Sequence, residues 1–206
     1  MSNIKKNYQS INNRLEKIIP IVKNKQVLDL GCADHSYDQK ENEPNWLHGI
    51  ISHYATEVIG IDIEDDAIQK MRSHGFTVIK SDVESFHLDK LFDVVVAGDV
   101  FEHLSNPGNT IKNIYNHLKN NGFFIITTPN PFSVSQFFKI VKRNSIKVRA
   151  DHTCWYDPVT IKTLLNLNGF DTVDIFLIKP KRMLHNVLSS YRNYFCPSFI
   201  AIAQKN

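Results

Sequence analysis

Two short apolar runs, each ending in a small or an acidic residue, constrain this chain most. Residues 27–30 lead directly into Gly31, and residues 58–61 end on Asp62. Continuous apolar runs of this length indicate buried parallel strands, and α/β folds bind nucleosides where the carboxyl ends of such strands meet. The chain is therefore predicted to hold a nucleotide-type cofactor at that edge of a sheet.

Apolar runs of this kind alternate with helical periods along most of the chain. We predict an α/β fold with a doubly wound, mostly parallel, seven-stranded sheet whose last strand is antiparallel. The expected strands are residues 26–30, 58–62, 76–80, 92–97, 122–128, 172–178 and 198–203.

Three helices are predicted from their apolar period and their end signals. Two begin at the caps Asn106 and Asp157, each followed by a proline, and end before Asn121 and Gly169. The third precedes the first strand, ends near Pro20 and carries its apolar stripe on Ile4, Tyr8, Ile11, Leu15 and Ile18.

Length and composition favour one domain over residues 1–206. It would comprise an N-terminal helix (1–22), a cofactor-binding core (25–178) and a basic and aromatic closing segment (179–206). A net charge of +3 is too mild to indicate a nucleic-acid partner. Three widely spaced cysteines suit a reduced compartment, and we find neither a signal peptide nor a membrane span. We therefore expect a cytoplasmic protein.

The turn after the first strand argues against a typical dinucleotide site. Gly31 is followed by Cys-Ala-Asp-His-Ser rather than by a full G-x-G-x-x-G motif, and Asp62 comes too late for the ribose acid of such a site. A sulfonium cofactor has no pyrophosphate to dock on a helix N-terminus and needs fewer glycines.

With these features the chain resembles the class I S-adenosylmethionine-dependent methyltransferases. Five segments match the family's motifs in the family's order: residues 27–32, 60–62, 80–83, 92–104 and 121–130. The resemblance covers residues 25–178 and implies a Rossmann-like methyltransferase fold with S-adenosyl-L-methionine as cofactor.

The resemblance also implies roles for single residues. Asp62 would accept hydrogen bonds from both ribose hydroxyls, and Asp82 would lie near the adenine amino group. Asp29 would anchor the amino-acid end of the cofactor. The expected cofactor-binding residues are Asp29, Gly31, Cys32, Ala33, Asp62, Ile63, Asp82, Val83 and Gly98.

Two histidines are candidate general bases. Methyl transfer is an in-line displacement in which positioning supplies most of the rate, so the remaining task is to remove a proton from a hydroxyl acceptor. His103 follows the fourth expected strand and His152 lies in a loop after the fifth, with Asp99 as a third candidate. The alternative is that His103 orders its loop through backbone carbonyls.

Spacing along the chain reveals no complete metal site. His152 with Cys154, or Cys32 with Asp34 and His35, is half a zinc site without a second half at usable spacing. We therefore predict no metal and turnover that survives a chelator.

The acceptor is expected to be a small molecule methylated at oxygen. Residues 151–158 and the compact length look like members of the family that modify sugars or nucleotide-linked glycan precursors. A phosphate-bearing acceptor would be drawn to basic residues near the active-site edge, namely Lys139, Lys142, Arg143, Lys147, Arg149, Lys179, Lys181 and Arg182.

Several alternatives stay open. Residues 102–104 suit a quinone or phenol methyltransferase, which an apolar patch at the pocket would favour, and an amine acceptor is a further option. Ala33, where the family usually has glycine, suits a non-catalytic cofactor-binding protein. Residues 44–49 either cover the cofactor or hold Trp46 in the core. The amphipathic stretch around Phe137 either lines an acceptor pocket or packs. The oligomeric state is undetermined, with a homodimer as one option.

Overall fold

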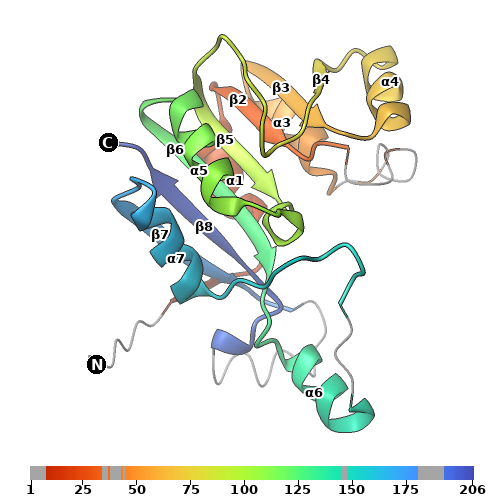
Figure 1. Cartoon of the computed structure of the whole chain (residues 1–206), viewed down its shortest axis with the longest axis vertical. Coiled ribbons are helices and arrows are strands. Elements are labelled where there is room, and N and C mark those ends of the chain that lie inside the picture. The colour runs from red at the N-terminus through yellow and green to blue at the C-terminus, as the bar shows by residue number, and fades with distance from the viewer. Residues whose placement is uncertain (1–7, 34–36, 38–42, 44, 145–147, 181–192) are drawn as a thin grey trace.

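The computed structural model describes residues 8–33, 37, 43, 45–144, 148–180 and 193–206. One eight-stranded sheet crosses these residues in the order β1-β7-β8-β6-β5-β2-β3-β4 (Figure 1). The strands are β1 (Gln9–Ile11), β2 (Gln26–Leu30), β3 (Glu57–Asp62), β4 (Val78–Lys80), β5 (Phe92–Gly98), β6 (Leu118–Pro129), β7 (Thr172–Ile178) and β8 (Ser198–Gln204). The helices are α1 (Leu15–Val22), α3 (Leu47–Tyr54), α4 (Asp65–Ser73), α5 (Pro107–His117), α6 (Val134–Arg143) and α7 (Pro158–Leu167), with short 3₁₀ turns η1 (Phe101–His103) and η2 (Asn193–Phe195).

The mostly parallel, doubly wound sheet is confirmed. Only β8 runs antiparallel to its neighbours, pairing with β6 and β7. The strand count is eight rather than seven, because residues 9–11 add β1, which pairs in parallel with β7.

The prediction of a continuous N-terminal helix is wrong in its first part. Tyr8 and Ile11 fit a helical stripe, but Ile11 is buried at the sheet edge, where its strand pairs with Ile178. The helix begins only at Leu15. It runs past Pro20 to Val22, because a proline removes a single N–H and its neighbours Ile18 and Val22 are fully buried.

The helix α5 ends earlier than its glycine signal indicates. Leu118 is buried and pairs with Phe92, so the chain enters β6 four residues before Gly122. Asn121 adopts a left-handed conformation inside that strand, where α5 was expected to stop. The two N-caps are confirmed: Asn106 and Asp157 both accept backbone N–H bonds at the predicted helix starts.

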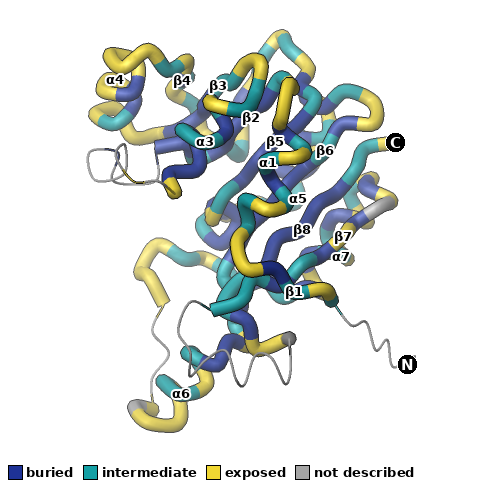
Figure 2. The backbone as a smooth tube through the Cα atoms, turned by 180° about the vertical axis from the view of Figure 1, so that it is seen from behind, coloured by how far each residue is buried: buried dark blue, intermediate teal, exposed yellow. Residues whose placement is uncertain are grey.

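Helices cover both faces of the sheet, and the central strands carry apolar side chains on both faces. In β5, Val94 and Val96 belong to the buried cluster that includes residues of α1 and α3, whereas Val95 and Ala97 belong to the cluster that includes residues of α5 and α7. Figure 1 shows α5 and α7 on the near face, and Figure 2 shows α1 and α3 from behind. This arrangement leaves the carboxyl ends of the parallel strands open for a site.

The structure bears on two alternatives that the sequence left open, one for the segment around Trp46 and one for the stretch around Phe137. Trp46 is 5 % exposed and packs edge-on against Tyr37 and Phe76, which is the core alternative for residues 45–49. Helix α6 extends away from the sheet, and Phe137 and Val141 on it are exposed (Figures 1 and 2). Across the described ranges, no helix is long and apolar enough to cross a bilayer.

Candidate active site at the carboxyl edge of the sheet

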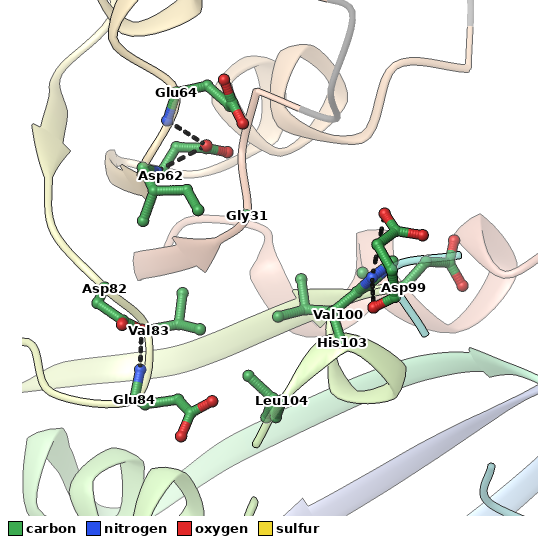
Figure 3. Close-up of a pocket in the computed structure, with 13 residues that line it drawn as sticks. Gly31, Asp62, Glu64, Asp82, Val83, Glu84, Asp99, Val100, His103 and Leu104 are labelled. Carbon is green, nitrogen blue, oxygen red and sulfur yellow. Dashed lines mark hydrogen bonds and ion pairs between the residues drawn. The ribbon is translucent and has the colours of Figure 1, made fainter. Parts of the chain in front are cut away.

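A cavity of about 340 Å³ opens where β2, β3, β4 and β5 end. Its volume falls within the range of small-molecule sites. Figure 3 shows Asp62 and Asp82 on one side, Asp99 and His103 on the other, and Gly31 between them. The lining residues are Gly31, Asp62, Ile63, Glu64, Asp82, Val83, Glu84, Gly98, Asp99, Val100, His103, Leu104 and Asp151.

Gly31 lines this cavity at a position that favours glycine. Its φ is +70°, and a Cβ at this position would lie 2.6 Å from Cγ2 of Val100. Its N–H donates to the carbonyl of Ile61 at 2.8 Å, which fixes the turn against β3. The missing side chain lets Val100 pack against the turn, and the Gly31 backbone itself lines the cavity at the end of β2.

Asp62 joins the turns that follow β2 and β3. It is 7 % exposed, and its Oδ2 accepts the Ala33 N–H at 2.9 Å. Its Oδ1 accepts the N–H groups of Ile63 and Glu64 at 2.8 and 3.1 Å. A carboxylate oxygen can accept two hydrogen bonds, so Oδ2 retains one position for a ligand hydroxyl. Ala33 and Cys32 are themselves buried.

Asp82 and Val83 line the side of the cavity beyond Asp62. The Asp82 carboxylate is exposed and accepts the Glu84 N–H at 2.8 Å, which forms a tight turn after β4. Glu84 accepts the N–H groups of Ser105 and Asn106 at 2.6 and 2.9 Å. These bonds tie the β4 turn to the start of α5.

Asp29 lies below this cavity rather than in it. It is 2 % exposed, and its Oδ2 lies 2.8 Å from Nδ1 of His48. Burial raises the pKa of Asp29, against the hydrogen bond from His48. The side chains of Asp29, Cys32 and His48 line a small hollow that also touches Gly31. His48 was not predicted, since nothing in its sequence neighbourhood points to β2.

Asp99 stands at the opposite end of the cavity in a strained conformation. Its φ is +56°, and its N–H donates to the backbone carbonyl of Thr127 at 2.9 Å. Nη1 of Arg14 lies 2.8 Å from its Oδ2 and 3.1 Å from Oγ1 of Thr127. Arg14 immediately precedes α1 and was not predicted, because no motif links it to a residue 85 positions away.

The two candidate histidines lie together, with ring centroids 4.7 Å apart. His103 lines the cavity from η1, and its Nδ1 lies 3.1 Å from the Asp151 carbonyl and 3.4 Å from the Asp151 carboxylate. His152 lies behind His103, and within the described chain its buried Nδ1 has no hydrogen-bond partner. Desolvation and the charge of His103 lower the pKa of His152. Thr153 holds this loop on η1 by donating to the Glu102 carbonyl at 2.8 Å.

Glu102 lies beside the two histidines. It is 2 % exposed, and its Oε2 accepts the Thr128 hydroxyl at 3.0 Å. Burial, assisted by the negative charge of Asp99, raises the pKa of Glu102 to about 7. One ligand atom from each of Glu102, His103 and His152 lies within 4.8 Å of the others, a group compact enough for a cation. Spacing along the chain did not reveal this group.

Some residues singled out in the sequence lie outside the described residues. They are Asp34 and His35 of the zinc half-site, and the basic residues Lys147, Lys181 and Arg182.

Comparison with known proteins identifies a matching domain family and curated relatives. The profile of a methyltransferase domain family matches residues 3–175. A ubiquinone biosynthesis O-methyltransferase from Rickettsia prowazekii is 29% identical over 137 residues, which cover 62% of this chain and 52% of that protein. The chain thus spans about half the length of this curated relative.

Solved structures show the same fold. A SAM-dependent methyltransferase from Archaeoglobus fulgidus aligns with a TM-score of 0.66 at 24% identity, covering 93% of this chain and 91% of that one. An N-methyltransferase from Bradyrhizobium japonicum in complex with S-adenosyl-L-homocysteine aligns with a TM-score of 0.60 at 14% identity, covering 93% and 85%. Since the family profile covers most of the chain, the chain belongs to the S-adenosylmethionine-dependent methyltransferase domain family.

Proposed function

We propose that this chain transfers a methyl group from S-adenosylmethionine to a hydroxyl oxygen of a small molecule. The observation that carries the proposal is His103, which lines the cofactor cavity with its Nδ1 3.1 Å from the Asp151 carbonyl and 3.4 Å from the Asp151 carboxylate. A histidine at the cavity wall whose Nδ1 faces such acceptors is suited to take a proton from a hydroxyl with its other ring nitrogen.

The cavity fits the cofactor at three points. Gly31 brings bare backbone to the cavity wall, where the methionine chain would lie, and the free acceptor position on Asp62 suits a ribose hydroxyl. Asp82 and Val83 would hold the adenine. When bound, this cofactor supplies an electrophilic methyl group on a sulfonium. The six carboxylates in the cavity lining suit that positive charge.

The protein's own work is then positioning and proton removal. Asp151 would hold the imidazole of His103 toward the cavity, and His152, packed against it, would restrict its rotation. Asp99 lies beside this group and, in this scheme, orients rather than reacts, because Arg14 already neutralises it. General-base assistance of this kind contributes about 10² to 10⁴ in rate.

A phenolic hydroxyl is the acceptor favoured by the names of the curated relatives, which are ubiquinone biosynthesis O-methyltransferases. The sugar or glycan-precursor acceptor suggested by residues 151–158 is the second candidate. The two differ in acidity, since a phenol ionises far more readily than a sugar hydroxyl, and only the latter depends wholly on a base.

The experiment combines labelled cofactor with acceptor pairs. Methyl-labelled S-adenosylmethionine and extract metabolites would identify the product, with catechol and 4-nitrocatechol as defined probes. His103→Gln should lower kcat on catechol by about 10² or more and leave affinity for S-adenosylhomocysteine unchanged. The loss should be much smaller on 4-nitrocatechol, which is already largely ionised. Equal losses on both probes would exclude a base role, and binding of S-adenosylhomocysteine without any turnover would favour a non-catalytic protein.

A further inference from the structure

A second cavity of about 250 Å³ adjoins the cofactor cavity at Asp99, which lines both. It lies over the ends of β6 and β7 and the first residue of β8, under the segment that precedes α1. Its lining residues are Asn12, Asn13, Arg14, Leu15, Asn45, Asp99, Thr127, Ile178, Lys179 and Ser198.

The two cavities differ in charge. The described lining of the cofactor cavity has six carboxylates and neither lysine nor arginine. The second cavity is lined by Arg14 and Lys179 with a single acid, Asp99, and its other polar groups are neutral amides and hydroxyls. An anion is therefore repelled by the first cavity and attracted by the second.

Lys179 is the cation whose charge is not compensated. Its position is fixed, because its N–H donates to the Ile11 carbonyl at 2.8 Å where β7 meets β1. The residue is half-buried, and throughout the described chain its ammonium group has neither a hydrogen-bond nor an ion-pair partner. A partly desolvated ammonium group gains from an anionic partner.

Arg14 offers the remaining donors. Its Nη1 is used by Asp99 and Thr127, at 2.8 and 3.1 Å. For Nε and Nη2 the described residues provide no partner. A guanidinium has five N–H donors in a fixed plane, so those that are left can bind a carboxylate or a phosphate while the pair with Asp99 stays intact.

We infer that this second cavity binds a carboxylate or phosphate group carried by the methyl acceptor. The inference rests on the proposed function and narrows its substrate class to anionic hydroxy compounds. Because the cavities meet at Asp99, an acceptor could place its anionic group between Arg14 and Lys179 and its hydroxyl beside His103.

The same chemistry has a second source, the carboxylate of the cofactor itself. Arg14 also lines the small hollow with Asp29 and Gly31, so the cofactor's amino-acid end could reach it. Lys179 lines neither that hollow nor the cofactor cavity. The behaviour of Lys179 variants therefore separates the two sources.

The test uses inorganic phosphate as the probe and protein saturated with S-adenosylhomocysteine, so that the cofactor's carboxylate is already in place. Phosphate affinity would be measured by ³¹P NMR titration. Lys179→Met should weaken it about tenfold or more, since a charge-assisted hydrogen bond is lost. Lys179→Arg should restore it. Lys112→Met, a matched change on an exposed lysine of α5, should leave it unchanged.

Three outcomes are decisive. Equal phosphate affinity in Lys179→Met and the parent, with both folded by circular dichroism, would overturn the inference. A loss of S-adenosylhomocysteine affinity in Lys179→Met, with 5′-methylthioadenosine binding unchanged, would assign the cavity to the cofactor and equally overturn it. Failure of the parent to bind S-adenosylhomocysteine would instead contradict the proposed function, and phosphate titration of the free protein would still test the cavity.

Discussion

Replacing Glu102 by glutamine should stabilise the protein at alkaline pH. Glu102 is 2 % exposed and receives one side-chain hydrogen bond, from Thr128 at 3.0 Å. Burial, with a smaller contribution from the charge of Asp99, raises its pKa from the usual 4.5 to about 7. The folded state therefore favours the protonated form of this carboxyl group.

The sign and size of the effect follow from that rise. A group whose folded pKa exceeds its unfolded pKa contributes its full stability below the unfolded value and loses it as pH rises through the folded value. At about 1.4 kcal/mol per pKa unit, the rise from 4.5 to about 7 amounts to about 3 kcal/mol, lost between about pH 4.5 and pH 7. Glutamine stays neutral and can still accept the Thr128 hydroxyl, so Glu102→Gln should not show this loss.

Urea unfolding at about pH 5 and about pH 9 would measure the effect. The free energy of unfolding of the parent should fall between these values by about 3 kcal/mol more than that of Glu102→Gln, because all other titrating groups, Asp29 included, are common to both proteins. Glu43→Gln, at an exposed position, serves as the control. Parallel pH profiles for Glu102→Gln and the parent would refute the assignment of the raised pKa to Glu102.

Three further predictions concern the cofactor cavity. Asp62→Ala should weaken S-adenosylhomocysteine binding by about ten- to a hundredfold in calorimetric titration. It should also lower the melting temperature, because three backbone N–H groups lose their acceptor. Unchanged affinity would contradict the role of Asp62 in cofactor binding. Gly31→Ala should destabilise the protein by about 1–2 kcal/mol and reduce cofactor affinity. The control Gly108→Ala, where no atom lies within 4 Å of the added Cβ, should not affect binding. Equal cofactor affinities of Gly31→Ala and the parent would show that the ligand does not cross the Gly31 turn. General-base catalysis by His103 predicts that turnover survives an excess of EDTA, and loss of activity restored by Mg²⁺ or Zn²⁺ would assign the Glu102, His103 and His152 group to a metal instead.

Local pattern was sufficient to place three of the proposed cofactor-binding residues around one cavity. Gly31, Asp62 and Asp82 lie at or within two residues of the ends of three parallel strands, and the carboxyl ends of such strands meet by topology alone. Their positions could therefore be predicted from strand ends without any knowledge of packing. The missed strand β1 shows the limit, because the three-residue pairing of Gln9–Ile11 with β7 leaves no periodic signal that outweighs a helical stripe.

The partners of these residues could not be predicted, because each comes from a distant part of the chain. His48 reaches Asp29 across 19 residues and Arg14 reaches Asp99 across 85. The same is true of Glu102 and His152, which are brought together where Thr153 binds the η1 backbone. Spacing rules for metal and catalytic sites apply to residues on one element, so groups assembled from two elements escape them.

The distribution of charge around Asp99 follows from the same tertiary contacts and bears on how the proposed reaction would be ordered. Six carboxylates surround a cavity suited to a cationic sulfonium, and methyl transfer removes that positive charge, which weakens the attraction for the spent cofactor. An anionic acceptor cannot gain from those carboxylates and needs a separate positive site. Arg14 serves both requirements: it neutralises Asp99, the one acid common to the two cavities, and it lines the second cavity together with Lys179. Loss of Arg14 would therefore expose the acceptor side to the negative charge of Asp99 as well as removing a donor, so its effect should exceed that of losing Lys179 alone.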